Sequence, residues 1–292
     1  MYLDELSTIE IIKQINDGDK KIACAVEKQS DNISKAVDLI VGAIENKGRL
    51  IYIGSGTSGK LGVIDASECP PTFGTDDSLV VGIVSGGADA LSGWLEHTED
   101  DIDLAIIDLK KITLRENDIL VGITASGNTP YAISALKYGK SLGCKTIGIS
   151  CSDSGKIKEI CDVSIEVILG PEIILGSTRM KAGTAQKMVL NMISTTVMIK
   201  LGKTYSNLMV NVKPINIKLQ NRVKDIVKVA TKADDYIVNE VVKKCNYDAK
   251  TSIIVIETGS SLIEAVQLLE KSRGNVWKTL KLWRGDKIEN NN

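Results

Sequence analysis

The chain has 292 residues, of which 43% are hydrophobic and 25% charged, and its formal net charge is −1. These values are typical of a globular protein with one large domain, or with one domain and a small appendage. A net charge so close to zero argues against nucleic acid or an anionic membrane as the main partner.

The cysteines and the apolar stretches narrow the class of protein further. The six cysteines include no C-x-x-C pair, so zinc and dithiol redox sites are disfavoured and reduced thiols are expected. The N-terminal residues lack the basic and apolar regions of a signal peptide, and polar residues interrupt the longest apolar stretch, at 188–199. We therefore expect a cytoplasmic protein without a membrane-spanning segment.

Helical spacing of apolar residues predicts helices over residues 5–47. After residue 49, short apolar runs alternate with helical patterns. Strands are expected at 50–53, 79–84, 119–124, 146–150 and 163–168, and helices at 58–68, 88–100, 129–142, 156–161 and 178–201. Short continuous apolar runs are typical of a parallel sheet covered by helices on both faces, so we predict a three-layer α/β fold.

The pattern changes after Pro214. We predict a first domain over residues 1–215 and a small, mostly helical domain over 216–292, with one strand-like run at 252–256. In parallel α/β folds, ligands bind beyond the carboxyl ends of the strands. The loops that follow the predicted strands are therefore the first places to look for a site.

Residues 54–59 (Gly-Ser-Gly-Thr-Ser-Gly) join the first predicted strand to a helix. Their G-x-G-x-x-G spacing matches the dinucleotide fingerprint, with Asp76 or Asp77 placed for a ribose, and the stretch to Lys60 fits most of a P-loop. Leu61 stands where a P-loop has its magnesium-binding hydroxyl, which argues against nucleoside triphosphate hydrolysis. Free amides at a helix start and the hydroxyls of this loop favour a phosphorylated ligand over a turn that binds nothing.

Residues 125–130 (Ala-Ser-Gly-Asn-Thr-Pro) form a second hydroxyl-rich loop between a strand and a helix. Pro130 suits the first turn of that helix, and Ser126, Asn128 and Thr129 offer hydroxyl and amide donors. A dinucleotide fold needs one pyrophosphate loop, whereas two such loops suit a small polar ligand with one phosphate. Capping of the helix by Asn128 and Thr129 is the alternative interpretation, and it uses the same groups.

Two glutamates continue the apolar stripes of predicted helices. Glu68 lies seven residues after Leu61, and Glu99 lies eight residues after Leu91, so each falls on the apolar face of its helix. A carboxyl in such a position is partly desolvated, which raises its pKa toward the range useful for general acid–base catalysis. Simple exposure at a helix end is the alternative.

The segment 170–187 (GPEIILGSTRMKAGTAQK) leads into the last helix of the first domain. Ser177 is expected to be the N-cap of that helix. Arg179 and Lys181 then fall in its first turn, where a cation opposes the helix dipole, so we expect an anion nearby. An ordinary solvated pair of cations is the alternative.

These segments resemble the N-acetylmuramic acid 6-phosphate etherase family, whose members contain a sugar isomerase (SIS) domain. The resemblance covers most of residues 49–212, and its motifs are specific. It is carried by GSGTSGKLGVIDASECPPTFG (54–74), ITASGNTPY (123–131), TIGISC (146–151), GPEIILGSTRMKAGTAQKMVLNMISTTVMIKLGK (170–203) and SNLMVNV (206–212).

The resemblance implies a three-layer, parallel-sheet SIS domain of the flavodoxin-like type with a small C-terminal helical domain, in a homodimeric lyase that uses no metal and no other cofactor. Such an enzyme cleaves the D-lactyl ether of N-acetylmuramic acid 6-phosphate to N-acetylglucosamine 6-phosphate and D-lactate, by elimination and then addition of water. This reaction belongs to the recycling of cell-wall amino sugars.

The resemblance also assigns roles to residues. Glu68 matches the family's catalytic acid, and Glu99 matches the second catalytic position, most simply the base that removes the C2 proton. Contacts to the sugar or its phosphate are expected from Ser55, Thr57, Ser58, Ser126, Asn128, Thr129, Glu172, Ser177, Thr178 and Lys181.

Three positions depart from the family's usual pattern. Lys60 and Asn128 stand where arginine is usual, and Ala88 stands where glutamate is usual. Loss of a guanidinium beside a phosphate loop weakens binding or changes which sugar phosphate is preferred. A non-catalytic, sugar-phosphate-binding regulator on the same scaffold is therefore one alternative to the lyase, and an NAD(P) enzyme built on residues 54–59 is a weaker one.

Overall fold

The computed structural model describes residues 2–93 and 97–285. The chain divides into two compact units, the first made of residues 1–67 and 77–195 and the second of residues 68–76 and 196–292. Two long helices, α4 (Gly56–Phe73) and α8 (Lys181–Lys200), begin in the first unit and end in the second. The domain boundary expected at residues 215/216 stays a prediction.

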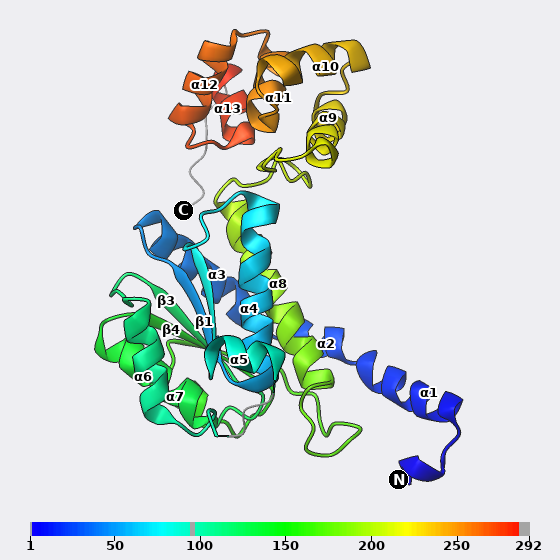
Figure 1. Ribbon diagram of the computed structural model, residues 1–292, viewed down its shortest axis with the longest axis vertical. Coiled ribbons are helices and arrows are strands. Elements are labelled where there is room, and N and C mark those ends of the chain that lie inside the picture. Colours follow the sequence, from blue (N-terminus) through cyan, green and yellow to red (C-terminus); the bar gives the residue numbers. More distant parts are fainter. Residues whose placement is uncertain (1, 94–96, 286–292) are drawn as a thin grey trace. The chain divides into compact units, whose positions relative to one another are not determined.

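The first unit contains a parallel sheet and the helices around it (Figure 1). Its elements other than α4 and α8 are η1 (Leu3–Glu5), α1 (Thr8–Asp19), α2 (Ile22–Glu27), α3 (Ser30–Glu45), β1 (Leu50–Gly54), β2 (Val80–Val84), α5 (Gly87–Ser92), α6 (Ile102–Lys111), β3 (Ile119–Ile123), α7 (Pro130–Ser141), β4 (Lys145–Ser150), η2 (Lys156–Glu159) and β5 (Val163–Glu166). The predicted strands are thus all present, within two residues at each end.

The sheet has five strands in the order β2-β1-β3-β4-β5, and every neighbouring pair is parallel. This is the flavodoxin-like order expected from the resemblance. Gly54 at the end of β1 lies opposite Val84 of β2 and Ile123 of β3. The strand order reverses beside β1, and such a reversal opens a crevice at the carboxyl ends of the strands. The fold therefore brings the loops after β1, β2 and β3 to one edge.

Alternate residues of β1 point to opposite faces of the sheet, as the pleat requires. Ile51 and Ile53 join a buried cluster with Leu109 of α6 and Leu136 of α7. Tyr52 points to the other face, where a side chain at Gly62 of α4 would lie 3.0 Å from its Cβ. Figure 1 shows α6 and α7 together on one side of the strands, away from α4. The predicted three-layer arrangement is therefore confirmed.

Two helix boundaries differ from the prediction. α4 continues through Pro70 and Pro71 to Phe73, although these prolines were expected to stop it. Cys69 (2% exposed) and Phe73 (8% exposed) are buried four residues apart on one face, and this packing offsets the hydrogen bonds that the prolines cannot donate. α8 begins at Lys181 instead of Thr178, so Ser177 is not its N-cap.

The predicted helix at 88–100 is only partly present, and residues 94–96 of that range lie outside the described residues. α5 ends at Ser92, because Gly93 adopts an extended conformation. A separate helix, α6, starts after Asp101, whose carboxylate accepts hydrogen bonds from the amides of Asp103 (3.0 Å) and Leu104 (2.9 Å). Aspartate is a preferred N-cap residue, so the sequence itself carries a signal at Asp101 for the start of α6.

The second unit is helical, with α9 (Ile217–Thr231), α10 (Asp235–Lys244), α11 (Ala249–Thr258), α12 (Leu262–Lys271) and α13 (Val276–Trp283). The expected strand at 252–256 is wrong, since these residues lie in α11. Asp248 caps this helix by accepting from the amide of Thr251 (2.7 Å), and Ile253 and Ile254 are fully buried. A buried helix and a buried strand give the same continuous apolar run.

Among residues 2–93 and 97–285, no helix is by itself both long and apolar enough to cross a bilayer. α11 and α12 reach that length and composition only as a pair, with a bend of 109° between them.

Candidate active site

The turn from β1 into α4 is built by close backbone approach. A Cβ atom at Gly59 would lie only 2.3 Å from the carbonyl oxygen of Gly54, so a larger residue does not fit there. The Gly59 amide makes the first hydrogen bond of α4, to the Ser55 carbonyl (3.2 Å). The amides of Gly56 and Thr57 precede it and have no partner within the helix. Together with the helix dipole, they form a site suited to an anion.

The serines of this turn face different surroundings. Ser58 is 7% exposed, and its hydroxyl donates to Gln186 Oε1 on α8 at 3.0 Å, so it ties the two helices together. The Ser55 hydroxyl is buried and has no hydrogen-bond partner among the described residues. Thr57 is exposed at the mouth of the turn.

A cavity of about 460 Å³ opens beside the start of α4. Its size is within the range of small-molecule sites. The start of α4, the end of β2, α5, the turn at residues 98–99 and the segment 176–179 form its wall. The lining residues are Gly56, Thr57, Lys60, Ser85, Ala90, Gly93, Thr98, Glu99, Gly176, Ser177, Thr178 and Arg179.

The cavity brings together four of the predicted site residues, namely Thr57, Glu99, Ser177 and Thr178. Glu99 is exposed in a turn and not on a helical stripe. Leu95, which would have completed that stripe, lies outside the described residues. The partial burial expected for Glu99 is therefore wrong for this single chain, although its carboxylate does lie at a cavity.

Four further lining residues with charged or hydroxyl side chains were not predicted as site residues. Lys60 and Arg179 supply positive charge, and the Ser85 and Thr98 hydroxyls are hydrogen-bonded to each other at 3.0 Å. Ser85 directly follows β2, and its amide donates to the Gly54 carbonyl at 3.0 Å. The rule that ligands bind at strand ends would have found Ser85 as it found the other two loops. The Lys60 ammonium donates to the Gly93 carbonyl at 3.2 Å.

The anion expected beside Arg179 and Lys181 stays a prediction, and the start of α8 is capped by Glu172. Its carboxylate accepts hydrogen bonds from the amides of Lys181 (3.0 Å) and Ala182 (2.9 Å). The Lys181 ammonium donates to the carbonyls of Leu169 (2.9 Å) and Pro171 (2.7 Å). Glu172 and Lys181 therefore hold the segment 170–181 in shape, and neither lines the cavity that contains Glu99.

The second hydroxyl-rich loop is closed by its own hydrogen bonds. Ser126 Oγ accepts from the Asn128 amide (3.1 Å), and the Thr124 and Thr129 hydroxyls pair at 2.8 Å. Thr129 occupies the N-cap position of α7 without a side-chain capping bond. Asn128 Oδ1 accepts from the Lys156 amide at 3.1 Å. None of Ser126, Asn128 and Thr129 lines the Glu99 cavity.

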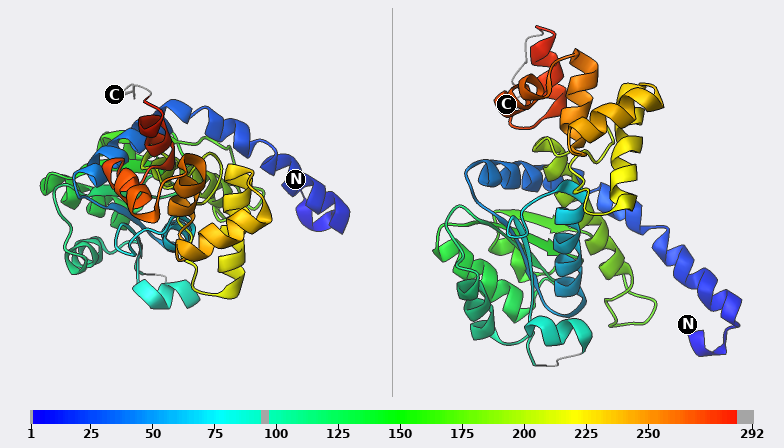
Figure 2. Two further views of the ribbon diagram at one scale, coloured as in Figure 1. Left: turned by 90° about the horizontal axis from the view of Figure 1, so that it is seen from above. Right: turned by 45° about the horizontal axis from the view of Figure 1, so that its top comes forward.

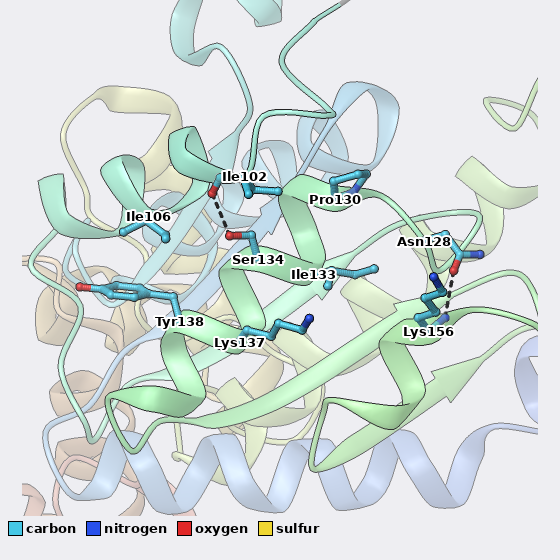
Figure 3. A pocket seen from close by; sticks show the side chains of 9 residues that line it. All are labelled: Ile102, Ile106, Asn128, Pro130, Ile133, Ser134, Lys137, Tyr138 and Lys156. Carbon is cyan, nitrogen blue, oxygen red and sulfur yellow. Dashed lines mark hydrogen bonds between the residues drawn. The ribbon is translucent and has the colours of Figure 1, made fainter.

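Asn128 instead borders a separate, open groove of about 790 Å³ beside α6 and α7 (Figure 3). Figure 3 shows the hydrogen bond between Asn128 and Lys156 at one end and the mainly apolar wall that α6 and α7 provide. The lining residues are Ile102, Ile106, Asn128, Pro130, Ile133, Ser134, Lys137, Tyr138 and Lys156. Lys137 and Lys156 give the groove positive charge, but neither Glu68 nor Glu99 lines it.

Glu68 shares α4 with Leu61 and Ile64, as predicted, but its side chain is exposed and Ile64 is 56% exposed. The partial burial expected for Glu68 is therefore wrong for the single chain. Glu68 lies eleven residues beyond Thr57, which at the helical rise is about 16 Å along the axis. It does not line the cavity that contains Glu99.

The buried carboxyl of α4 is Asp65, which the sequence analysis missed. It is 6% exposed and accepts hydrogen bonds from Asn191 Nδ2 (2.6 Å) and Ser194 Oγ (3.1 Å) on α8. Burial raises the pKa of the Asp65 carboxyl above its usual value, while these hydrogen bonds oppose the shift. Asp65 and Ser58 thus join α4 to α8 at two levels.

Metal-ligating side chains do not gather in the described part of the chain. Residues 2–93 and 97–285 contain no group of three or more His, Cys, Asp or Glu side chains arranged to hold a metal ion. Lys60, Arg179 and the start of α4 supply positive charge at the cavity that Glu99 lines.

Comparison with known families and structures identifies the fold. Residues 32–140 match the glucokinase regulatory protein N-terminal SIS domain, and residues 102–196 match the SIS domain family. A Bacteroides fragilis structure described as a phosphosugar isomerase is 25% identical, with a TM-score of 0.50 over 66% of this chain and 91% of that chain. A phosphoheptose isomerase from Francisella tularensis, 15% identical, also has a TM-score of 0.50, over 67% of this chain and 100% of that chain.

Curated relatives are similar along nearly the whole chain. N-acetylmuramic acid 6-phosphate etherase of Caldanaerobacter subterraneus subsp. tengcongensis is 50% identical, over 97% of this chain and 92% of that protein. The Clostridium botulinum protein of the same name is also 50% identical, over 96% and 92%, and that of Vibrio atlanticus is 47% identical over the same shares. The chain belongs to the N-acetylmuramic acid 6-phosphate etherase family.

Membership of the etherase family confirms the resemblance found in the motifs. The SIS domain of this etherase-family chain carries the cavity at Glu99, and the family motif GSTRMKAG supplies its wall at residues 176–179. The etherase-family name says nothing of which residues do the chemistry. The roles of Glu68 and Glu99 stay predictions at this point.

Proposed function

We propose that this chain is a carbon–oxygen lyase that cleaves the D-lactyl ether of N-acetylmuramic acid 6-phosphate, in the recycling of cell-wall amino sugars. One observation carries the proposal: Glu99 lines the same cavity as the first residues of α4 and two cationic residues, Lys60 and Arg179. An anion site and a carboxylate base within one small cavity are what a sugar-phosphate elimination requires.

The phosphate binds at the start of α4 in this proposal. The amides of Gly56 and Thr57 and the positive end of the helix dipole point at it, and Lys60 adds charge one turn further along. The hydroxyls of Thr57, Ser177 and Thr178 donate to its oxygens or to the sugar. A bound phosphate also gives the buried Ser55 hydroxyl at this turn a partner.

The chemistry proceeds on the ring-opened sugar. Glu99 removes the proton at C2, which is acidic because C1 is an aldehyde, and the electron pair forms the C2=C3 double bond as the C3–O bond breaks. Glu68 protonates the departing ether oxygen, which leaves as D-lactate. Glu68 then removes a proton from water as the water oxygen adds to C3, and Glu99 returns a proton to C2. The product is N-acetylglucosamine 6-phosphate, and both carboxyls regain their starting states.

A homodimer completes the site. Glu68 lies about 16 Å beyond Thr57 along α4, too far to meet a sugar whose phosphate is held at the start of that helix. We therefore assign the catalytic acid to Glu68 of a second copy of the chain. In the first unit, Ile64 of α4 and Met192 of α8 are 56% and 42% exposed, and such apolar exposure supports an interface.

The N-terminal helix supports the same assembly. α1 has no buried residue, and its Ile9 and Ile12 are 57% and 54% exposed. Figure 2 shows α1 extending from the sheet of its own unit as an arm. An amphipathic helix in this position suits packing against a second copy. We also propose a cytoplasmic location. The near-neutral net charge supports the further expectation that neither nucleic acid nor a membrane is a partner.

The test is release of D-lactate from N-acetylmuramic acid 6-phosphate by the purified protein. We expect turnover by the wild type and none by Glu99→Gln, while both bind N-acetylglucosamine 6-phosphate in calorimetry. Binding of that sugar phosphate by a wild-type protein that releases no lactate would instead support the non-catalytic regulator. The departures at Lys60, Ala88 and Asn128 are the observations that favour that alternative.

A further inference from the structure

The cavity at Glu99 has cations on two different walls. Lys60 comes from the second turn of α4, and Arg179 comes from the segment before α8. The proposed substrate carries two anions, the phosphate at C6 and the carboxylate of the lactyl group at C3. The product that remains in the site keeps only the phosphate. Two cations facing a doubly anionic substrate raise the question of which cation binds which anion.

We propose that Arg179 binds the carboxylate of the lactyl group and thereby selects the ether substrate over sugar phosphates that lack it. This inference rests on the proposed function and adds a specificity-determining residue to it. The phosphate belongs at the start of α4, because that wall offers free amides and the positive end of a long helix. Lys60 lies on that same helix and so belongs with the phosphate. The other anion is left to Arg179, the cation of the segment before α8.

The contacts of the cations support this division. The Lys60 ammonium already donates to the Gly93 carbonyl, and Lys181 is bound to two backbone carbonyls away from the cavity. Arg179 is exposed and makes no hydrogen bond or ion pair within the described residues. A guanidinium with free N–H groups binds a carboxylate with two parallel hydrogen bonds, which a lysine cannot reproduce.

Arg179 acts as a positioning and binding group, since it holds its proton throughout the reaction. Holding the carboxylate fixes the lactyl group, and with it the ether oxygen that must be protonated as the C3–O bond breaks. After cleavage the carboxylate leaves with the D-lactate, so Arg179 has no anion to bind in the enal or in the final product. The residue therefore discriminates by binding the substrate and not the product.

The experiment compares substrate and product binding in Arg179→Met. We expect the KM for N-acetylmuramic acid 6-phosphate to rise about 10- to 100-fold, while the inhibition constant of N-acetylglucosamine 6-phosphate as a competitive inhibitor stays within about twofold. Arg179→Lys should recover only part of the loss. Lys60→Met should weaken substrate and product alike, and Arg222→Met, which removes an exposed guanidinium of α9, should change neither.

Two results would overturn the inference. Equal weakening of substrate and product by Arg179→Met would move Arg179 to the phosphate, and no effect on either would remove it from the site. Both results leave the proposed function intact, because the wild type still releases lactate. Absence of lactate release by the wild type would instead reject the proposed function itself. Thermal unfolding of each variant separates a binding defect from a folding defect.

Discussion

The carboxylate of Glu172 accepts a hydrogen bond from the backbone amide of Lys181 at 3.0 Å, where α8 begins. A second bond, from the amide of Ala182 at 2.9 Å, completes the cap. The segment between Glu172 and Lys181 carries Ser177, Thr178 and Arg179 into the cavity. The shape of that wall therefore depends on a carboxylate that does not itself touch the cavity.

Glu172→Ala should consequently reduce both stability and substrate binding. Loss of a carboxylate cap costs about 1 kcal/mol of unfolding free energy, and the freed segment no longer holds Ser177 and Arg179 in place. Urea unfolding and the KM for the ether substrate measure the two effects. Glu159→Ala, which removes an exposed carboxylate of η2, is the matched control and should change neither. A normal KM in Glu172→Ala would show that the wall keeps its shape without the cap.

A buried ion pair lies at the end of the sheet opposite the loops of the candidate site. Asp118 is 0% exposed and accepts from the guanidinium of Arg49 at 2.6 Å, and it also accepts from the amides of Arg49 (2.9 Å) and Arg115 (3.0 Å). These bonds fix the start of β1 against the start of β3. The carboxyl ends of the same two strands lead into the two hydroxyl-rich loops.

Asp118→Asn should destabilise the protein by about 3 kcal/mol or more, because it leaves a largely buried guanidinium without its counter-charge. Equilibrium unfolding in urea gives this value. The exposed pair of Asp17 and Lys20 provides the control, since Asp17→Asn should have no measurable effect. A loss in Asp118→Asn no greater than in that control would show that the pair does not hold the strands together.

The buried carboxyl of Asp65 predicts a pH effect. Because its pKa is raised in the folded state, the folded chain binds the proton more tightly than the unfolded chain. Its stabilising contribution is full below the unfolded value of about 3.9 and is lost as the pH rises through the folded-state pKa. The Asp65→Asn variant has no titrating group at residue 65. The difference between its unfolding free energy and that of the wild type should therefore increase as the pH rises from the unfolded-state pKa through the folded-state pKa. Parallel curves from urea unfolding at a series of pH values would contradict the assignment.

The shared active site can be tested with two inactive variants. Glu68→Gln and Glu99→Gln subunits, co-expressed with different tags, form mixed dimers in which one site has both intact carboxyls. We expect each variant alone to be inactive and the mixture to recover about a quarter of the wild-type lactate release, since half of the dimers are mixed. Dimers purified through both tags that stay inactive would place both glutamates in one chain.

Much of the fold was predictable because its local signals agree with its packing. The strands of a parallel sheet are buried on both faces and so appear as apolar runs, and the glycine spacing at 54–59 reflects the contact of Gly59 with the Gly54 carbonyl. The predictions failed at positions where tertiary packing, and not the local sequence pattern, determines the secondary structure. Cys69 and Phe73 carry α4 past two prolines, and the run at 252–256 is apolar because it is a buried helix.

The candidate site was less predictable for a related reason. Glu68 and Glu99 were chosen by helical phase, but Glu99 lies in a turn and both side chains are exposed in the single chain. The position of a residue around its own helix does not show which residues a second copy of the chain would contact. Asp65 was missed, although it lies on the same helix, because a buried carboxyl is recognised by the Asn191 and Ser194 donors that reach it from α8.

The central claim is that Glu99 removes the C2 proton in an elimination that water addition then completes. The most direct measurement is mass spectrometry of N-acetylglucosamine 6-phosphate formed in D2O from N-acetylmuramic acid 6-phosphate. The account predicts deuterium at C2 in the wild-type product and a loss of product formation of about 1,000-fold or more in Glu99→Gln. A product without deuterium at C2, or normal turnover by Glu99→Gln, would contradict it.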